Sequence, residues 1–269
     1  MERCAQGESG SRDLEAVRKV ALWFFSFSKG RSLADNHPFM RWLIIIGLFF
    51  VFGTLGVSAQ EREDIVLTGG PALRFMEHGK AASHDVYWFN FVDASVIRLK
   101  ELKAQTQRGE LITWVVYRPG YASRSTEMGV NLPAQIEAKA RAVGVRLVWF
   151  DTKEELISYF NRGLDRSKIK IGSFDYFGHS NKACFLFDYS NTIDTMSVVW
   201  LHVRDLKFID RNDFARDALC KSWGCHSGEM YSQWWKSQFD VALTGAIGKT
   251  DFEHGGLPVL SSADGKWGQ

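Results

Sequence analysis

The sequence has little excess of either charge. It holds 33 Lys and Arg residues against 31 Asp and Glu residues in 269 positions, and residues 60–269 contain 26 of each sign. A protein that neutralises many phosphates needs a basic surface, so we expect no general nucleic-acid binding. Internal repeats and low-complexity tracts are also missing. A content of 45% apolar and 24% charged residues is that of an ordinary folded chain, with one large domain or one domain and appendages.

Metal-binding spacings are missing as well. No C-x-x-C or H-E-x-x-H motif occurs, so we expect no metal and no other cofactor. Cysteine is scarce, and beyond residue 59 only Cys184, Cys220 and Cys225 remain. This odd number leaves at least one thiol free. A disulfide between Cys184 and Cys220 and a pair of buried thiols are both compatible with the pattern.

The one long uncharged run spans residues 42–60. A Met-Arg pair precedes this run, an apolar core occupies most of it, and Val57-Ser58-Ala59 lies near its end. Residues 40–59 therefore have the pattern of a secretory signal peptide, and we expect an exported chain, periplasmic or extracellular, that begins at Gln60. A retained membrane anchor is the alternative, and only then do we expect contact with a membrane. Residues 1–39 are an upstream extension, either a misassigned start or a cytoplasmic tail.

Residues 111–269 alternate between short apolar runs and amphipathic stretches. This pattern predicts strand–helix units around a mainly parallel sheet. Residues 60–110 are interpreted as an N-terminal segment that packs on this main domain and contains a helix within 85–103. Residues 184–189 are expected to form a short hairpin strand, and 198–203 are ambiguous. The other expected strands are 111–117, 145–150, 169–177, 218–223 and 241–247, and the expected helices are 133–143, 153–161 and 229–238.

Two reactive side chains follow strands of the expected sheet. His179 comes after strand 169–177 and Cys225 after strand 218–223, each beside a glycine that permits a tight turn. Reactive groups collect at the carboxyl ends of strands in an open parallel sheet. A thiolate is a nucleophile, and an imidazole can take its proton or protonate a leaving amine. The pair therefore indicates acyl transfer, and the positive end of the following helix would favour the thiolate.

The motifs around these two residues resemble those of the caspase-like cysteine peptidases. Residues 176–180 read Tyr-Phe-Gly-His-Ser, and residues 222–228 read Ser-Trp-Gly-Cys-His-Ser-Gly. The Cys-His-Ser-Gly tetrapeptide is similar to that of metacaspases, and Gly-Cys-x-Ser-Gly to those of separases and CHAT peptidases. The likeness covers about residues 111–251 in the order and spacing of elements. It implies a caspase-like three-layer α/β fold, with a mainly parallel central sheet flanked by helices.

The same resemblance implies roles for single residues. Cys225 would be the nucleophile that forms a thioester, and His179 the general base and acid. Gly178 and Gly224 would shape the turns beside them. The oxyanion would be held by the backbone N–H groups of Cys225 and Ser180. His226 is expected to be structural or to line a pocket.

Two positions depart from the family pattern. Ser180 stands where the family usually has glycine, and Trp223 stands where metacaspases carry an acidic residue that binds a basic substrate side chain. Trp223, Arg118, Asp175 and Asp251 are the candidate pocket residues, because each is expected at a strand end. Two carboxylates against one guanidinium favour a basic substrate residue over an acidic one, and a pocket that selects neither charge, with Trp223 as its wall, is the other alternative. Arg118 is equally compatible with a solvated loop.

The leading hypothesis from the sequence is an exported caspase-like cysteine peptidase that acts on a protein or peptide. A catalytically silent caspase-like binding module is the first alternative, because Ser180 and Trp223 depart from the family. An amidase or acyltransferase that uses the same Cys/His pair is the second. The sequence leaves the oligomeric state open.

Overall fold

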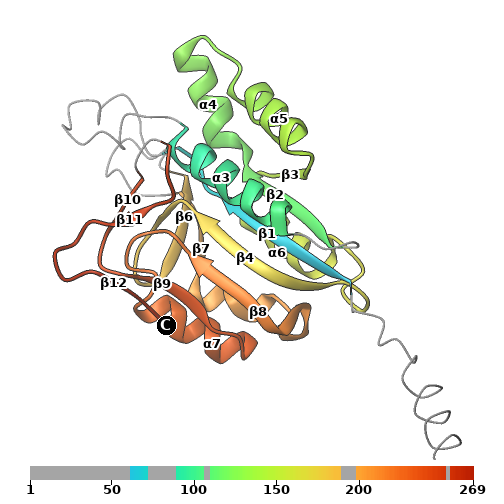
Figure 1. The fold of residues 1–269 in the computed structure, drawn as a ribbon, viewed down its shortest axis with the longest axis vertical. Helices are drawn as coiled ribbons and strands as arrows, with labels where there is room; N and C mark the ends of the chain where they lie inside the picture. Colours follow the sequence, from blue (N-terminus) through green and yellow to red (C-terminus); the bar gives the residue numbers. More distant parts are fainter. Residues whose placement is uncertain (1–60, 72–88, 106–109, 189–197, 253–254) are drawn as a thin grey trace, which may run out of the picture. The chain divides into compact units, whose positions relative to one another are not determined.

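A seven-stranded sheet in the order β12-β9-β8-β4-β1-β2-β3 forms the centre of the protein (Figure 1). The computed structural model describes residues 61–71, 89–105, 110–188, 198–252 and 255–269. All neighbouring strands run parallel except β12, which is antiparallel to β9. The expected α/β class with a mostly parallel sheet is confirmed. The strands are β1 Arg62–Thr68, β2 Leu111–Tyr117, β3 Arg146–Phe150, β4 Lys170–Phe177, β8 Phe214–Ser222, β9 Leu243–Ile247 and β12 Lys266–Gly268.

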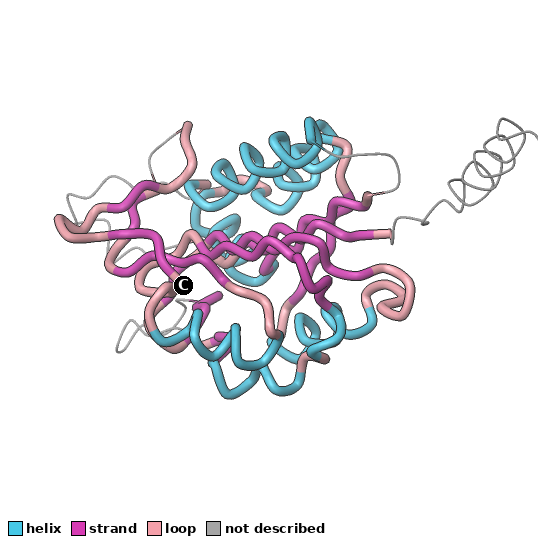
Figure 2. Tube along the Cα trace, turned by 60° about the horizontal axis from the view of Figure 1, so that its bottom comes forward, coloured by secondary structure: helices cyan, strands magenta, loops and turns pink. Residues whose placement is uncertain are grey.

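Helices lie on both faces of this sheet (Figure 2). Helices α3 (Asn90–Gln105), α4 (Arg118–Met128) and α5 (Leu132–Val143) bury one apolar cluster against the first face. Helices α6 (Lys153–Arg162) and α7 (Met230–Phe239) bury a second cluster against the opposite face. Burial of these two clusters, rather than helix propensity, is the main source of helix stability. None of the helices in the described ranges is long and apolar enough to cross a membrane.

Two small sheets and two short 3₁₀ helices complete the described part. Strands β5 (His179–Ser180), β6 (Cys184–Asp188) and β7 (Val199–His202) form an antiparallel sheet, as expected for a hairpin at 184–189. Strands β10 (Thr250–Asp251) and β11 (Val259–Leu260) pair beyond the end of β9. The 3₁₀ helices are η3 (Val203–Phe208) and η4 (Arg211–Asp213).

Local signals explain where several helices begin and end. The Thr152 hydroxyl accepts a hydrogen bond from the Glu155 N–H at 3.2 Å and caps α6, as its sequence predicts. The Asn131 side chain caps α5 in the same way, and Gly144 ends that helix in the left-handed region with φ of 75°. These caps satisfy backbone groups that the helix itself leaves unpaired.

The segment 60–110 contributes more to the sheet than its sequence suggests. Strand β1 lies between β4 and β2, in the middle of the sheet, and no strand was expected there. Its sequence begins Arg-Glu-Asp, but Glu63 is fully buried. The Glu63 carboxylate pairs with Arg166 at 2.7 Å and accepts hydrogen bonds from the hydroxyls of Thr113 and Tyr159. These partners compensate the loss of hydration that such burial entails.

Residues 1–39 and the expected signal or anchor at 40–59 lie outside the described residues. Residues 60–269 form a compact unit of their own.

Candidate active site

The segments that carry His179 and Cys225 lie against each other at the carboxyl ends of β4 and β8. The Ser180 hydroxyl donates a hydrogen bond to the Cys225 carbonyl oxygen at 2.6 Å. A Cβ on Gly224 would lie 2.3 Å from the Ser180 Oγ and 2.7 Å from the Gly178 carbonyl oxygen. Such an approach is possible only without a side chain at position 224. The structure therefore brings together the two segments that the sequence singled out.

Gly178 makes the turn that brings His179 to this position. A Cβ there would lie 2.5 Å from the Tyr176 Oη, so no larger residue fits. The Tyr176 hydroxyl, which is fully buried, donates to the His179 carbonyl oxygen at 2.6 Å. These contacts fix the backbone under the histidine.

His179 is half-buried, and its side chain packs against α3. The Phe91 ring of α3 meets the imidazole edge to face, with 4.9 Å between ring centroids. Phe91 also meets Phe252 edge to face at 4.6 Å. Aromatic side chains thus form a wall beside the imidazole and restrict its rotation.

Cys225 is half-buried, and its thiol contacts Thr250 of β10. The Thr250 N–H donates to the Cys225 Sγ at 3.3 Å, and the Thr250 Oγ1 lies 3.5 Å from the sulfur. The Thr250 hydroxyl also donates to the Trp223 carbonyl oxygen at 2.9 Å. The N–H contact suits either a thiol or a thiolate, because both can accept a hydrogen bond.

A tight turn follows Cys225 and leads into α7. His226 has φ of 57°, and its N–H donates to the Gly248 carbonyl oxygen at 2.7 Å. Gly228 packs so closely on the neighbouring strand that a Cβ would lie 2.3 Å from the Gly245 carbonyl oxygen.

Among the described residues, the Cys225 N–H has no hydrogen-bond acceptor. It is free for the oxyanion role that the resemblance implies.

Two of the four candidate pocket residues, Asp175 and Trp223, bind each other. The Asp175 carboxylate accepts hydrogen bonds from the Trp223 Nε1–H and the Arg98 Nε–H, both at 2.9 Å. Its burial raises its pKa, and the two donors oppose that rise. The Trp223 ring stacks on Phe177, and the Lys221 ammonium lies 3.4 Å from its centroid. The Asp175 charge is therefore compensated within the protein.

Asp175 and Trp223 line a cleft of about 390 Å³ over β8 and β9, and neither His179 nor Cys225 belongs to its walls. Another hollow, of about 970 Å³, lies at the amino-terminal ends of β1, β4 and β8, away from the site.

The other two pocket candidates lie in different places. Arg118 is the first residue of α4, not a loop residue, and it forms a two-pronged ion pair with Asp151. Its strand, β2, is separated from β8 by β4 and β1, so the structure does not bring Arg118 to Cys225. Asp251 follows Thr250 in β10 and is the pocket candidate nearest in sequence to a residue that contacts the thiol.

Several residues of the site were not foreseen from the sequence. Thr250, the hydroxyl of Ser180 and the carboxylate of Glu229 all contribute polar contacts here. Their only sequence signal is position, since each lies next to a motif or just after a strand.

Cys184, Cys220 and Cys225 form no disulfide. Within the described part of the chain, no three His, Cys, Asp or Glu side chains cluster closely enough to hold a metal. The chain matches no protein-family model, no curated protein and no solved structure.

Proposed function

We propose that the chain is a caspase-like cysteine peptidase in which Cys225 forms a thioester and His179 acts as general base and acid. The observation that carries the proposal is the direct contact between the two segments, made by Ser180, Gly178 and Gly224. Both residues are partly exposed, although the His179 Nε2 itself is buried. The mostly parallel sheet with helices on both faces supports a caspase-like three-layer fold for the chain.

In the proposed reaction, His179 takes the proton of the Cys225 thiol, and the thiolate attacks the scissile carbonyl carbon. The N–H groups of Cys225 and Ser180 stabilise the oxyanion. The C–N bond then breaks, and the imidazolium gives its proton to the leaving amine. A water molecule attacks the thioester with His179 again as base, and this step releases the carboxylic acid and restores the thiol.

Fewer charged residues are available to select the substrate side chain than the sequence suggested. The preference for a basic residue relied on Asp175 and Asp251, and the Asp175 carboxylate is bound to Arg98 and Trp223. A basic preference now depends on Asp251 alone. Arg118, the acid-binding candidate, is paired with Asp151.

A peptide library tests the proposal. The full chain is expected to cleave it, and both Cys225→Ala and His179→Ala are expected to reduce kcat/KM by at least about a thousand-fold. The double variant should be little worse than either single variant, because the two residues act as one unit. Cys184→Ala, which removes another half-buried thiol, is the matched control and should retain activity. Full cleavage by Cys225→Ala would refute the proposal.

The contacts of the thiol favour one other candidate, a catalytically silent binding module with the same fold. The Cys225 Sγ lies 3.6 Å from the Thr250 carbonyl oxygen, an acceptor that holds a thiol but repels a thiolate. A silent module predicts no cleavage of any library member and slow alkylation of Cys225.

For the chain before Gln60, we propose export with cleavage after Ala59. Mass analysis of the exported protein should find Gln60 as its first residue, whereas a chain that keeps residues 40–59 at the membrane would establish the anchored form.

A further inference from the structure

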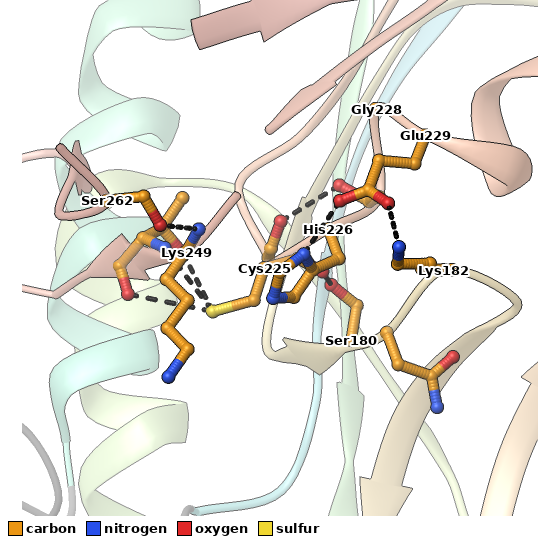
Figure 3. Close-up of polar contacts among 12 residues, drawn as sticks. Ser180, Lys182, Cys225, His226, Gly228, Glu229, Lys249 and Ser262 are labelled. Atoms are coloured by element: carbon orange, nitrogen blue, oxygen red, sulfur yellow. Dashed lines mark hydrogen bonds and ion pairs between the residues drawn. The ribbon is translucent and has the colours of Figure 1, made fainter. Parts of the chain in front are cut away.

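A charged bridge links the two segments of the candidate site (Figure 3). One Glu229 carboxylate oxygen lies 2.7 Å from the His226 Nδ1, and the other lies 2.7 Å from the Lys182 Nζ. Lys182 belongs to the turn that follows His179, and His226 follows Cys225. Glu229 therefore contacts both reactive segments, although it is neither of the two reactive residues.

The bridge also reaches a third segment. Gly248, between β9 and β10, lies beside the bridge, and its backbone helps to lower the pKa of Glu229. The Gly248 carbonyl oxygen in turn accepts the His226 N–H at 2.7 Å. Thr250, two residues further on, donates its N–H to the thiol sulfur. The Glu229 carboxylate thus contacts the segments of the histidine and the cysteine directly, and it is linked to the segment of Thr250 through His226.

The segments at both ends of the bridge have fixed backbones. The Asn181 side chain accepts the N–H groups of Ala183 and Cys184, both at 2.8 Å, so the turn around Lys182 is held from within. At the other end, His226 has φ of 57°, in the left-handed region that a side chain disfavours. A conformation of this kind persists only where neighbouring contacts hold it, and Glu229 supplies one of them.

The charge of Glu229 is maintained by its partners. Hydrogen bonds from Lys182 and His226 lower its pKa, so it is a carboxylate at neutral pH. The Lys182 side chain is 66% exposed, so the ion pair alone adds little to stability in water. Its effect is on the relative position of the two turns.

We propose that Glu229 is a positioning residue for the reaction, and that its carboxylate holds the turn after His179 and the turn after Cys225 in register. The proposal rests on the proposed function, because register matters only if His179 exchanges a proton with Cys225. Glu229 touches neither reacting atom. It acts on the cysteine segment through its contact with His226.

The test compares kcat and KM of the full chain and its variants on a cleaved library peptide. Glu229→Gln preserves the volume but removes the charge, and kcat should fall about 10- to 100-fold with KM nearly unchanged, as for a small misplacement of reacting groups. Lys182→Gln should lower kcat less, because His226 still holds the carboxylate. The double variant should be no worse than Glu229→Gln. Lys236→Gln, which removes a lysine ion pair with Asp240 at the other end of α7, is the control and should be unchanged.

An unchanged kcat in Glu229→Gln, or additive losses in the double variant, would overturn the proposal. A rise in KM with unchanged kcat would overturn it too, because Glu229 would then bind substrate.

Failure of the proposed function is recognised separately, since the wild type would then cleave no more than Cys225→Ala. In that case amide hydrogen exchange tests the bridge. Residues 181–184 and 225–229 should exchange faster in Glu229→Gln and Lys182→Gln at unchanged global stability. Unchanged exchange in both variants would show that the bridge holds nothing in place.

Discussion

Gly224→Ala tests the contact on which the site depends. The added Cβ would lie 2.3 Å from the Ser180 Oγ, 3.0 Å from its Cβ and 2.7 Å from the Gly178 carbonyl oxygen. The last of these is a backbone atom, which cannot rotate away. Overpacking of this kind costs about 1–3 kcal/mol, and displacement of Ser180 breaks its hydrogen bond to Cys225, worth about 1 kcal/mol. Together these effects should lower the free energy of unfolding by about 2–4 kcal/mol.

Thermal unfolding measures this loss. For a unit of this size, a loss of about 2–4 kcal/mol corresponds to a decrease in Tm of about 4–16 °C. Gly256→Ala is the control, because no atom lies within 4 Å of the Cβ it would add. Its stability should stay within about 0.5 kcal/mol of the wild type. If Gly224→Ala were as stable as Gly256→Ala, the two segments would not be in the contact described.

Three further predictions concern charge and thiol reactivity. Asp175→Ala leaves the buried Trp223 Nε1–H and the Arg98 Nε–H without their acceptor, while Arg98 keeps its ion pair with Glu101, and should cost about 2–3 kcal/mol in urea unfolding; a loss below about 1 kcal/mol would contradict this. Burial raises the pKa of Cys184 to about 11, so iodoacetamide at pH 7 should label Cys225 before Cys184, and equal rates would contradict this. Burial also raises the pKa of Asp213 to about 6, so the folded chain binds this proton more tightly than the unfolded chain and loses stability as pH rises from about 4 to about 6. Asp213→Asn should therefore have a higher urea midpoint than wild type above pH 6 and an equal one at pH 4; equal midpoints at both would contradict this.

Apolar runs with clear boundaries could be predicted from the sequence. Strand β2 spans Leu111–Tyr117, as expected, and α6 begins after its Thr152 cap. Helix α4 was not foreseen, because its Arg-Pro-Gly start resembles a turn. Pro suits the first turn of a helix, and Gly120 is required there because a Cβ would lie 2.9 Å from the Pro71 Cδ. The need for glycine at position 120 could not be predicted, because Pro71 is distant in sequence.

Strand β1 and the pocket residues could not be predicted for a related reason. The acidic start of β1 is buried only because Arg166, Thr113 and Tyr159 meet Glu63, and such partners come from tertiary structure. From the sequence, Asp175 is a charged residue at a strand end. Its partners Arg98 and Trp223 are brought to it only by the tertiary structure. Strand ends can be predicted from hydrophobic pattern, whereas the partners of a charge cannot.

The most direct test of the account is to trap the acyl-enzyme. An acid quench during turnover of a cleaved peptide, followed by mass analysis, should find the acyl group of the substrate on Cys225 as a thioester. The His179→Ala variant should show almost none, because the thiol then has no base. Continued product formation with no adduct on Cys225, or an adduct on Cys184 or Cys220 instead, would contradict the assignment of Cys225 as the nucleophile.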